Sequence, residues 1–417
     1  MTGSRAVLRP PQLPGSGVSS GAGSGSGSGG PLRVATVITR LEGGAGVLAL
    51  RGAQSLEAGV ARPTIITGSG GRLLDEAAAS GIEVIVEPAL REVIAPRSDL
   101  LAVGRLETVF RQRDFDVVHT HCAKAGAVGR LAARRAAVPR IVHTYHGFPF
   151  HEFQSALRRR AYVSVERRLG RITDVALCVG GAVAAEAVRR ELVAPQRVRT
   201  IGVCVDGPGR VRASMSARSP QARQRARRAL GVPAGSPVVG AVGRLTYQKA
   251  PEDFIDAISG LGRPDVVGVW VGDGELAESA GRRARRLSGP RVILAGERTD
   301  VLDVLPAFDV FALPSRYEGL PTAIVEAMIC GVPVVATAVN AVSELVVPGE
   351  TGMLVPPGRP ARLTAAIGHL LDSPATAARM AASARARLGD RYGDADLRAA
   401  LLSAYSPAVS PALRTGG

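Results

Sequence analysis

The sequence predicts an α/β protein with two domains, each built on a parallel β-sheet that helices cover on both faces. Short apolar runs rich in β-branched residues alternate with helix-type runs along most of the 417 residues. This alternation is typical of parallel sheets with helical crossovers. It stops at residues 206–237, which are rich in Pro, Gly, Ser and Arg, and then starts again. A chain of this length has room for two cores of ordinary size.

The first domain is predicted over residues 31–205. Its strands are expected, in order, at LRVATVIT, RPTIITGSGG, IEVIVEP, FDVVHTH, RIVHTYHG and VALCVGG. A glycine loop, LEGGAG, precedes the first helix-type segment, VLALRGAQSLEAG. Further helices are expected at RLLDEAAASG, AKAGAVGRLAARRA and SALRRRAYVSVERRLGRIT. Because strands and helices follow one another in turn, the sheet is predicted to be parallel.

The second domain is predicted over residues 238–385. Strands are expected at PVVGAVGRL, VVGVWVGDG, RVILAGE, VFALPS and VPVVATA, with helices at APEDFIDAIS, ELAESAGRRARRL and TAIVEAMICG. Residues 206–237 form a basic interdomain linker and helix in this scheme, and residues 386–406 a helix that returns to the first domain. The Gly/Ser-rich residues 1–30 are predicted to be a disordered tail, and residues 407–417 a flexible one. Ligands in such folds bind at the carboxyl ends of the strands, so the default site lies between the two domains.

Composition narrows the class of protein. Hydrophobic residues make up 46% of the chain and charged residues 21%, which is typical of globular proteins. The four cysteines are scattered without a CxxC pair or a zinc-type spacing, so no metal site is expected and a reduced, cytoplasmic protein is predicted. No apolar run reaches the roughly 18 residues of a membrane span, and we expect no signal peptide.

The excess of positive charge is concentrated in one stretch. The formal net charge is +16, and residues 151–235 contribute 17 basic but only 6 acidic residues. Within this stretch, residues 156–171 interleave arginines with apolar side chains, which suits an anionic membrane surface such as the inner face of the plasma membrane. An ordinary amphipathic helix with a solvated arginine face is the other interpretation. Nucleic-acid binding is disfavoured, because aromatic residues are only 4% of the chain.

The stretch PSRYEGLPTAIVEAMICGVPVVAT carries two glutamates, Glu318 and Glu326, around a Gly-Leu-Pro corner. The strand before it ends at the corner, and Pro321 suits the first turn of the following helix. Free N–H groups at a helix start favour a phosphate or sugar oxygen. A carboxylate accepts two hydroxyl hydrogen bonds side by side, which suits vicinal sugar hydroxyls. The alternative is a pair of helix-surface charges without a ligand.

This Glu-x7-Glu block, followed by ELVVPGETGMLVPPG, resembles the C-terminal half of the retaining family-four glycosyltransferases of GT-B fold. GRLTYQKAPEDFI resembles the segment of that family that binds the donor diphosphate. LEGGAG resembles its first glycine loop, and HTYHG its histidine after a strand of the N-terminal domain. The resemblance runs from about residue 33 to about residue 404.

The resemblance implies a metal-independent hexosyltransferase that moves a sugar from a nucleotide-diphosphate-sugar to an acceptor hydroxyl with retention of configuration. The donor, UDP- or GDP-linked, is then a co-substrate, and no cofactor is expected. The acceptor is implied to be lipid-linked or a glycan, in the synthesis of cell-envelope polysaccharide or glycolipid. Two alternatives stay open: a nucleotide-sugar epimerase of the same fold, and a non-catalytic nucleotide-sugar-binding protein.

The family also implies roles for the acidic block. Glu326 would hold the ribose hydroxyls of the donor, and Glu318 would bind the transferred sugar near its C3 and C4 hydroxyls. The backbone N–H groups of Gly319, Leu320 and neighbouring residues would contact sugar and diphosphate, with Pro321 beside them in the donor site.

The remaining implied site residues lie elsewhere in the chain. Arg244 and Lys249 would neutralise the diphosphate as the glycosidic bond breaks. Gly43 and Gly44 would allow close approach of the backbone to donor phosphate and acceptor, and His146 would line the sugar pocket. The alternatives are a plain turn for the glycines and a core histidine for His146.

The chain departs from the family pattern in three places. Glycines, among them Gly180, stand where the family usually has a serine after a strand. Val203 and Cys204 stand where Asn-Gly is usual. Asn340 and Ala341 stand where paired glycines are common, and Ser343 stands where the family often has a proline. None of them removes a charged donor-site group. They bear on acceptor geometry and on the hinge between the domains.

Overall fold

The computed structural model describes residues 7–8, 30–148, 154–205 and 219–406. The chain divides into two compact units. The first unit contains the described residues up to Cys178, then Glu186–Ile201, and the chain from Leu397 onward. The second contains Val179–Ala185 and Gly202–Asp396. Residues 206–218 of the predicted linker and most of the two predicted tails lie outside the described residues.

The first unit is built on an eight-stranded sheet in the order β1-β4-β3-β2-β5-β6-β7-β8, parallel except for β1. Its strands are β1 Val7–Leu8, β2 Leu32–Leu41, β3 Ala61–Gly70, β4 Glu83–Val86, β5 Val117–His121, β6 Arg140–Tyr145, β7 Val175–Cys178 and β8 Val198–Thr200. The helices between the strands are α1 Gly43–Ser55, α2 Arg72–Ala79, α3 Pro96–Arg113, α4 Ala123–Arg135, α5 Ala156–Gly170, α6 Gly181–Arg189 and the 3-10 turn η1 Pro195–Arg197.

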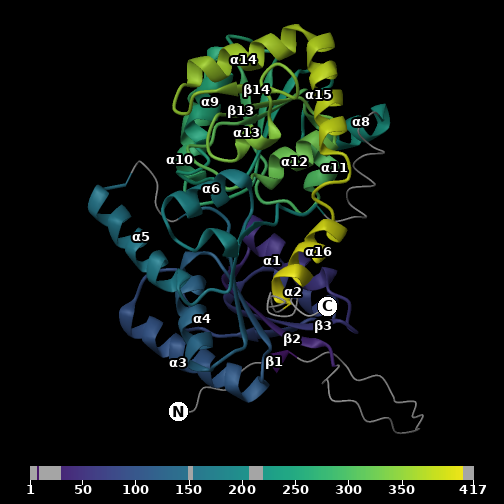
Figure 1. Cartoon of the computed structure of the whole chain (residues 1–417). Helices are drawn as coiled ribbons and strands as arrows, with labels where there is room; N and C mark the ends of the chain where they lie inside the picture. The colour runs from purple at the N-terminus through teal and green to yellow at the C-terminus, as the bar shows by residue number, and fades with distance from the viewer. Residues whose placement is uncertain (1–6, 9–29, 149–153, 206–218, 407–417) are drawn as a thin grey trace, which may run out of the picture. The chain divides into compact units, whose positions relative to one another are not determined.

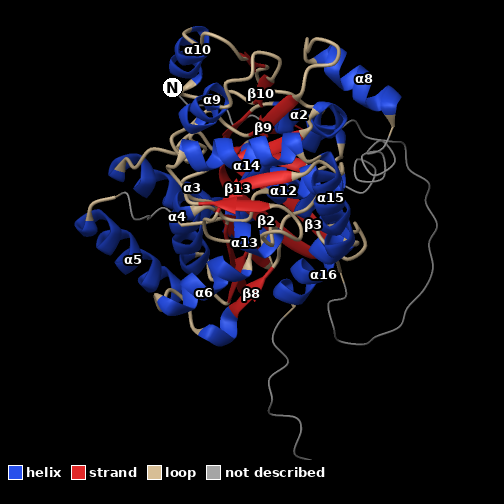
Figure 2. Cartoon of the chain, turned by 90° about the horizontal axis from the view of Figure 1, so that it is seen from above, coloured by secondary structure: helices blue, strands red, loops and turns tan. Residues whose placement is uncertain are grey.

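Successive side chains of the central strand β2 point alternately to the two faces of the sheet, which explains why helices cover both faces. Val37 packs with Phe110 of α3 and Val128 of α4 in one buried cluster. The next residue, Ile38, packs with Leu50 of α1 and its surroundings in a second cluster. Successive side chains of a strand point to opposite faces, so a strand buried on both faces reads as a continuous apolar run. Figure 2 shows helices on both sides of the strands.

The second unit has a six-stranded, all-parallel sheet in the order β11-β10-β9-β12-β13-β14. Its strands are β9 Val238–Val242, β10 Val267–Val271, β11 Arg291–Leu294, β12 Val310–Leu313, β13 Val334–Thr337 and β14 Met353–Val355. Its helices are α8 Pro220–Ala229, α9 Pro251–Gly260, α10 Ala277–Arg285, α11 Val301–Val304, η2 Leu305–Ala307, α12 Thr322–Ile329, α13 Val342–Leu345, α14 Pro360–Asp372 and α15 Pro374–Leu388. The α/β class with two parallel sheets predicted from the sequence is confirmed.

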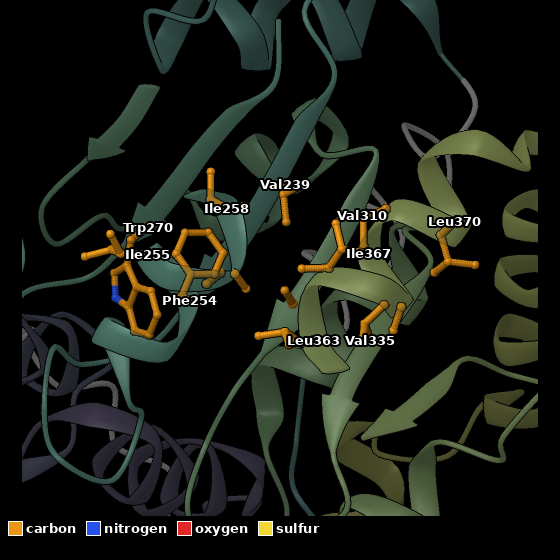
Figure 3. Packing of buried hydrophobic residues seen from close by; sticks show 14 of the residues in the cluster. Val239, Phe254, Ile255, Ile258, Trp270, Val310, Val335, Leu363, Ile367 and Leu370 are labelled. Atoms are coloured by element: carbon orange, nitrogen blue, oxygen red, sulfur yellow. The ribbon is translucent and has the colours of Figure 1, made fainter. Parts of the chain in front are cut away.

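One apolar cluster holds a face of this second sheet to α9 and α14, which lie side by side (Figure 1). Figure 3 shows the cluster, with Phe254 of α9 beside Trp270 of β10, their rings edge to face at 5.4 Å between centroids. The indole nitrogen of Trp270 donates to the carbonyl of Gly243 at 2.8 Å. The cluster therefore fixes the end of β9, the strand whose following loop carries Lys249.

Several elements differ from the sequence prediction. Gly43 and Gly44 open helix α1 and are not a loop before it, because the N–H of Gly46 bonds the carbonyl of Glu42 and closes the first turn. Val7–Leu8 pairs antiparallel with β4 inside the predicted disordered tail, since the open edge of a sheet accepts any extended backbone.

The C-terminal helix is also shorter than predicted. Over residues 386–406 the chain breaks at Gly389, where φ is 52°, and α16 Asp394–Tyr405 begins only afterwards. From Leu397 the chain belongs to the first unit, where Arg140 donates to the carbonyl of Ala404 at 3.0 Å.

Candidate active site

Lys249 and Glu318 meet at the carboxyl ends of two neighbouring strands of the second unit. Lys249 follows β9 and Glu318 follows β12, and these strands pair in parallel. The Nζ of Lys249 lies 2.5 Å from Oε1 of Glu318. Ser315 donates its hydroxyl to the same oxygen at 2.6 Å, and Gln248 donates to Oε2 at 3.3 Å. The Glu318 carboxylate is thus buried with its charge matched and its orientation fixed.

Arg316 ties together the two loops that carry this pair, a role that the sequence analysis missed. Its N–H donates to the carbonyl of Gln248 at 2.8 Å, and its Nη1 donates to the carbonyl of Tyr247 at 2.6 Å. Its Nη2 lies 2.6 Å from a carboxylate oxygen of Glu252. Arg316 therefore positions Lys249 without belonging to the cluster itself.

Helix α12 starts beside Glu318 with free backbone donors. Pro321 is its N-cap and offers no capping side chain. The N–H groups of Gly319 and Leu320 donate to no described residue, whereas the N–H of Glu318 donates to Oδ1 of Asn340 at 3.2 Å. Free N–H groups and the helix dipole favour an anion at this position.

The side chains of Arg244 and Glu326 have no hydrogen-bond or ion-pair partner among the described residues. Arg244 follows β9 and is exposed, and its guanidinium forms no ion pair or hydrogen bond with the described part of the chain. Glu326 is half-buried on α12, and no described residue donates to its carboxyl group. Burial raises the pKa of Glu326 to about 7. No hydrogen bond joins these two side chains to the Lys249–Glu318 pair in the described structure.

The glycines at the start of α1 have different reasons to be glycine. Gly43 has φ of 62°, a conformation that favours glycine. A Cβ on Gly46 would lie 2.8 Å from the carbonyl carbon of Leu41, so packing explains that residue. A Cβ on Gly44 would meet nothing within 4 Å. The protein's own packing therefore does not require glycine at position 44.

Four histidines gather near the carboxyl ends of β5 and β6 in the first unit. His119 and His121 share one face of β5, with ring centroids 4.3 Å apart. Nδ1 of His121 lies 2.9 Å from Nε2 of His146. Burial lowers the pKa of His119 to about 3 and of His146 to about 4, and it lowers the pKa values of His121 and His143 well below their usual range. All four rings are therefore neutral at physiological pH.

The histidines are held by hydroxyl groups. His119 bonds the hydroxyl of Tyr405 at 2.9 Å through Nδ1 and that of Thr144 at 2.7 Å through Nε2. His143 bonds the hydroxyl of Thr120 at 2.8 Å. Among the described residues there is no group of three or more His, Cys, Asp or Glu side chains that could hold a metal ion.

Two departures from the family pattern, Gly180 and Ala341, compensate each other inside the second unit. A Cβ on Gly180 would lie 2.9 Å from the Cβ of Ala341, so an alanine at 341 requires a glycine at 180. The N–H groups of Gly181 and Ala182 donate to the carboxylate of Glu344 at 2.8 and 2.6 Å. This carboxylate supplies the helix cap that a serine side chain would otherwise provide.

Asn340 accounts for a further departure. Its φ is 43°, in the left-handed region where asparagine is, after glycine, among the best tolerated residues. It therefore replaces a glycine without changing the backbone, and its side chain gains the hydrogen bond to Glu318.

Comparison with known proteins places this architecture in a family. Residues 236–373 match the family described as "Glycosyl transferases group 1", and residues 42–206 match "Glycosyltransferase Family 4". The "UDP-Gal:alpha-D-GlcNAc-diphosphoundecaprenol alpha-1,3-galactosyltransferase" of Escherichia coli is 32% identical over 274 residues, which cover 64% of this chain and 69% of that protein. The "D-inositol 3-phosphate glycosyltransferase" of Xylanimonas cellulosilytica is 32% identical over 318 residues, covering 71% of this chain and 72% of the relative.

Solved structures agree in fold. The Anabaena protein Alr3699/HepE, crystallised in complex with UDP-glucose, superposes with a TM-score of 0.76 at 23% sequence identity, over 89% of this chain and 98% of that one. None of the described helices combines the length and the apolar character that a membrane span requires. The chain is a glycosyltransferase of GT-B fold and belongs to the group 1 transferases of glycosyltransferase family 4.

Proposed function

We propose that the protein transfers a hexose from a UDP-sugar to a hydroxyl group of a lipid-linked acceptor, with retention of the anomeric configuration. The observation that carries the proposal is the cluster at the carboxyl ends of β9 and β12, where Lys249 and Glu318 lie beside free N–H groups at the start of α12. The choice of UDP and of a lipid-linked acceptor is supported by the names of the Escherichia coli relative and the Anabaena structure.

Each group of the cluster suits one part of the donor. A diphosphate needs cations and N–H donors where its negative charge grows as the glycosidic bond breaks, and Lys249, Arg244 and the N–H groups of Gly319 and Leu320 offer both. The Glu318 carboxylate has lone pairs left for sugar hydroxyls, because its present donors do not use all of its acceptor capacity. No described residue donates to the carboxyl group of Glu326, which would receive the ribose hydroxyls.

The chemistry then needs no nucleophile from the protein. The acceptor hydroxyl attacks the anomeric carbon from the face that the diphosphate leaves, and the leaving phosphate oxygen takes the acceptor proton. Lys249 and Arg244 stabilise the negative charge on the departing diphosphate.

A thermal-shift series tests the donor class. UDP, GDP, ADP, dTDP and CDP are each added to the wild-type protein and to the Lys249→Ala variant. A ligand at 100 times its dissociation constant stabilises the folded state by about 2.7 kcal/mol. UDP alone is expected to raise the melting temperature, and the shift should shrink in the variant. A response to GDP but not to UDP would overturn the proposed donor, and no response to any of them would favour a non-catalytic protein.

The ionisation of Glu326 predicts a pH dependence of nucleotide binding. Burial keeps this carboxyl protonated below pH 7 in the free protein, and hydroxyl donors bind the carboxylate form better. UDP affinity should therefore rise as the pH increases from 6 to 8, by up to about tenfold. Calorimetric titrations of wild type and Glu326→Gln measure this, since the ratio of their affinities removes the titration of UDP itself. A ratio that does not change with pH contradicts the assignment of Glu326 to the ribose.

We further propose that α5 rests on an anionic membrane surface. Only Glu166, Leu169 and Gly170 of this helix are buried, and Leu157 is 81% exposed. Arg160 and Arg168 are exposed and form no ion pair with described residues. Arginines interleaved with exposed apolar side chains suit an anionic leaflet.

Liposome sedimentation tests this surface. The triple variant Arg158→Gln, Arg160→Gln and Arg168→Gln should bind phosphatidylserine vesicles about 100-fold more weakly, at about 1 kcal/mol for each arginine. The control replaces Arg282 and Arg285 of α10, and Arg286 directly after it, with glutamine, which removes the same charge from the second unit. Equal losses in both variants, or equal binding to zwitterionic vesicles, would exclude a specific role of α5.

A further inference from the structure

The hydrogen bond between His121 and His146 contains one proton, and its position decides what His146 can do. The two atoms are Nδ1 of His121 and Nε2 of His146, 2.9 Å apart. Both rings are neutral, so each carries one proton and one nitrogen lone pair. Either His121 donates, and the proton of His146 then sits on Nδ1, or His146 donates from Nε2 and its Nδ1 is a bare acceptor.

The other nitrogen of His121 distinguishes the two arrangements. Nε2 of His121 is buried and has no hydrogen-bond partner among the described residues. If His146 were the donor, His121 would keep its proton on this Nε2, and a buried N–H group would be left without an acceptor. Unpaired buried N–H groups are rarer in proteins than acceptors with an unused lone pair. The arrangement with the proton on Nδ1 of His121 leaves only a lone pair unused.

The neighbouring His143 shows the same pattern with an independent constraint. Its Nε2 is also buried and bonds no residue that the structure describes, and its Nδ1 lies 2.8 Å from the hydroxyl of Thr120. That hydroxyl donates its proton to the carbonyl of Val142 at 3.3 Å. It therefore accepts from Nδ1 of His143, so this ring too carries its proton on Nδ1 and leaves Nε2 bare.

We propose that His121 is a positioning residue that holds His146 in the tautomer protonated on Nδ1, so that His146 presents a hydrogen-bond donor and not a general base to a bound sugar. The inference rests on the proposed function and on the role that the family resemblance implies for His146, which is to line the sugar pocket. The Nε2 lone pair of His146 is occupied by His121, and its Nδ1–H bonds no described residue. The acceptor proton must then leave by another route, for which the departing diphosphate is the available base.

The tautomer is measured directly on the wild-type protein, without any substrate. Long-range ¹H–¹⁵N correlation spectra of the protein labelled with ¹⁵N-histidine report which ring nitrogen is protonated, and the spectrum of His146→Gln assigns the signals of His146. We expect a protonated Nδ1 and an unprotonated Nε2 for His146. A proton on Nε2 overturns the proposal. This reading stands even if the protein uses no UDP-sugar, so its failure is distinct from failure of the proposed function.

Two variants of equal size at position 121 then separate positioning from packing. In His121→Asn the side-chain amide replaces Nδ1–H as a donor, whereas in His121→Asp the carboxylate offers only acceptors. We expect the asparagine variant to keep the wild-type tautomer and transfer rates within about threefold, and the aspartate variant to move the proton to Nε2 and lose at least about tenfold in kcat, with UDP binding unchanged in both. Equal losses of kcat in the two variants contradict the proposal. If neither variant folds, the wild-type spectrum still decides.

Discussion

Replacing Lys249 with methionine is expected to lower kcat for sugar transfer by about 100- to 1,000-fold, the effect of removing one preorganised group that stabilises developing charge. The ammonium of Lys249 lies 2.5 Å from Glu318 and is only 16% exposed, so its position is fixed before the donor arrives. It has three donors and spends one on Glu318 in the described structure. The loss should appear in kcat more than in KM, because the charge on the diphosphate grows in the transition state.

The chain contains its own control for this substitution. Lys124 is the only other lysine of the sequence, and its Nζ lies 2.5 Å from a carboxylate oxygen of Asp99 in the first unit. Lys124→Met removes the same charge and an ion pair of similar burial. We expect its kcat to stay within about threefold of wild type. Steady-state assays of UDP release measure both variants, and equal losses would show that Lys249 acts through stability alone.

Removing Arg130 is expected to have the largest effect on stability. Its side chain is fully buried, and its Nη2 lies 2.8 Å from Oε2 of Glu166, which also accepts from the hydroxyl of Tyr145 at 3.0 Å. Burial alone would lower the pKa of Arg130, but the Glu166 carboxylate raises it above its usual value. Arg130→Met leaves a buried carboxylate without its cation, which costs about 3–5 kcal/mol of the free energy of unfolding. The pair joins α4 to α5, so the packing of the basic helix depends on it.

Denaturant unfolding of the wild type and four variants tests this prediction. Arg113→Met breaks an exposed pair with Glu83 in the same unit and should cost no more than about 1 kcal/mol. The double variant Arg130→Met, Glu166→Met removes both charges and should be less destabilised than the sum of the two single variants. Additive losses would mean that the two residues act separately and that the buried pair is not the source of the effect.

The meeting of Lys249 and Glu318 could be predicted from the sequence, because each lies in the loop that follows an apolar strand and the carboxyl ends of parallel strands lie along one edge. Helix α3 could also have been predicted from the sequence, although the sequence analysis did not identify it. Pro96 starts it and Asp99 lies in its first turn, and apolar residues at Ala102, Leu106 and Val109 follow the helical period.

Contacts between distant segments could not be predicted in this way. Tyr405 bonds His119 across 286 positions of sequence, and Glu344 caps the helix that begins at Gly181. No neighbouring residue in the sequence indicates such partners for His119 and His121. From the sequence alone, these histidines are therefore only residues at the end of a strand. Alanine at position 341 requires glycine at position 180, and this dependence likewise becomes apparent only when the structure shows the two residues in contact.

The stereochemistry of donor cleavage tests the central claim most directly and needs no acceptor. UDP-galactose, UDP-glucose and UDP-N-acetylglucosamine are incubated with the wild-type protein, and ¹H NMR records the anomer of the sugar first released to water, before mutarotation. A retaining transferase at the Lys249–Glu318 site is expected to release UDP and the α-anomer from one of these donors, and Lys249→Met should release neither at a comparable rate. First release of the β-anomer, or wild-type release that the Lys249→Met substitution does not slow, would contradict the account.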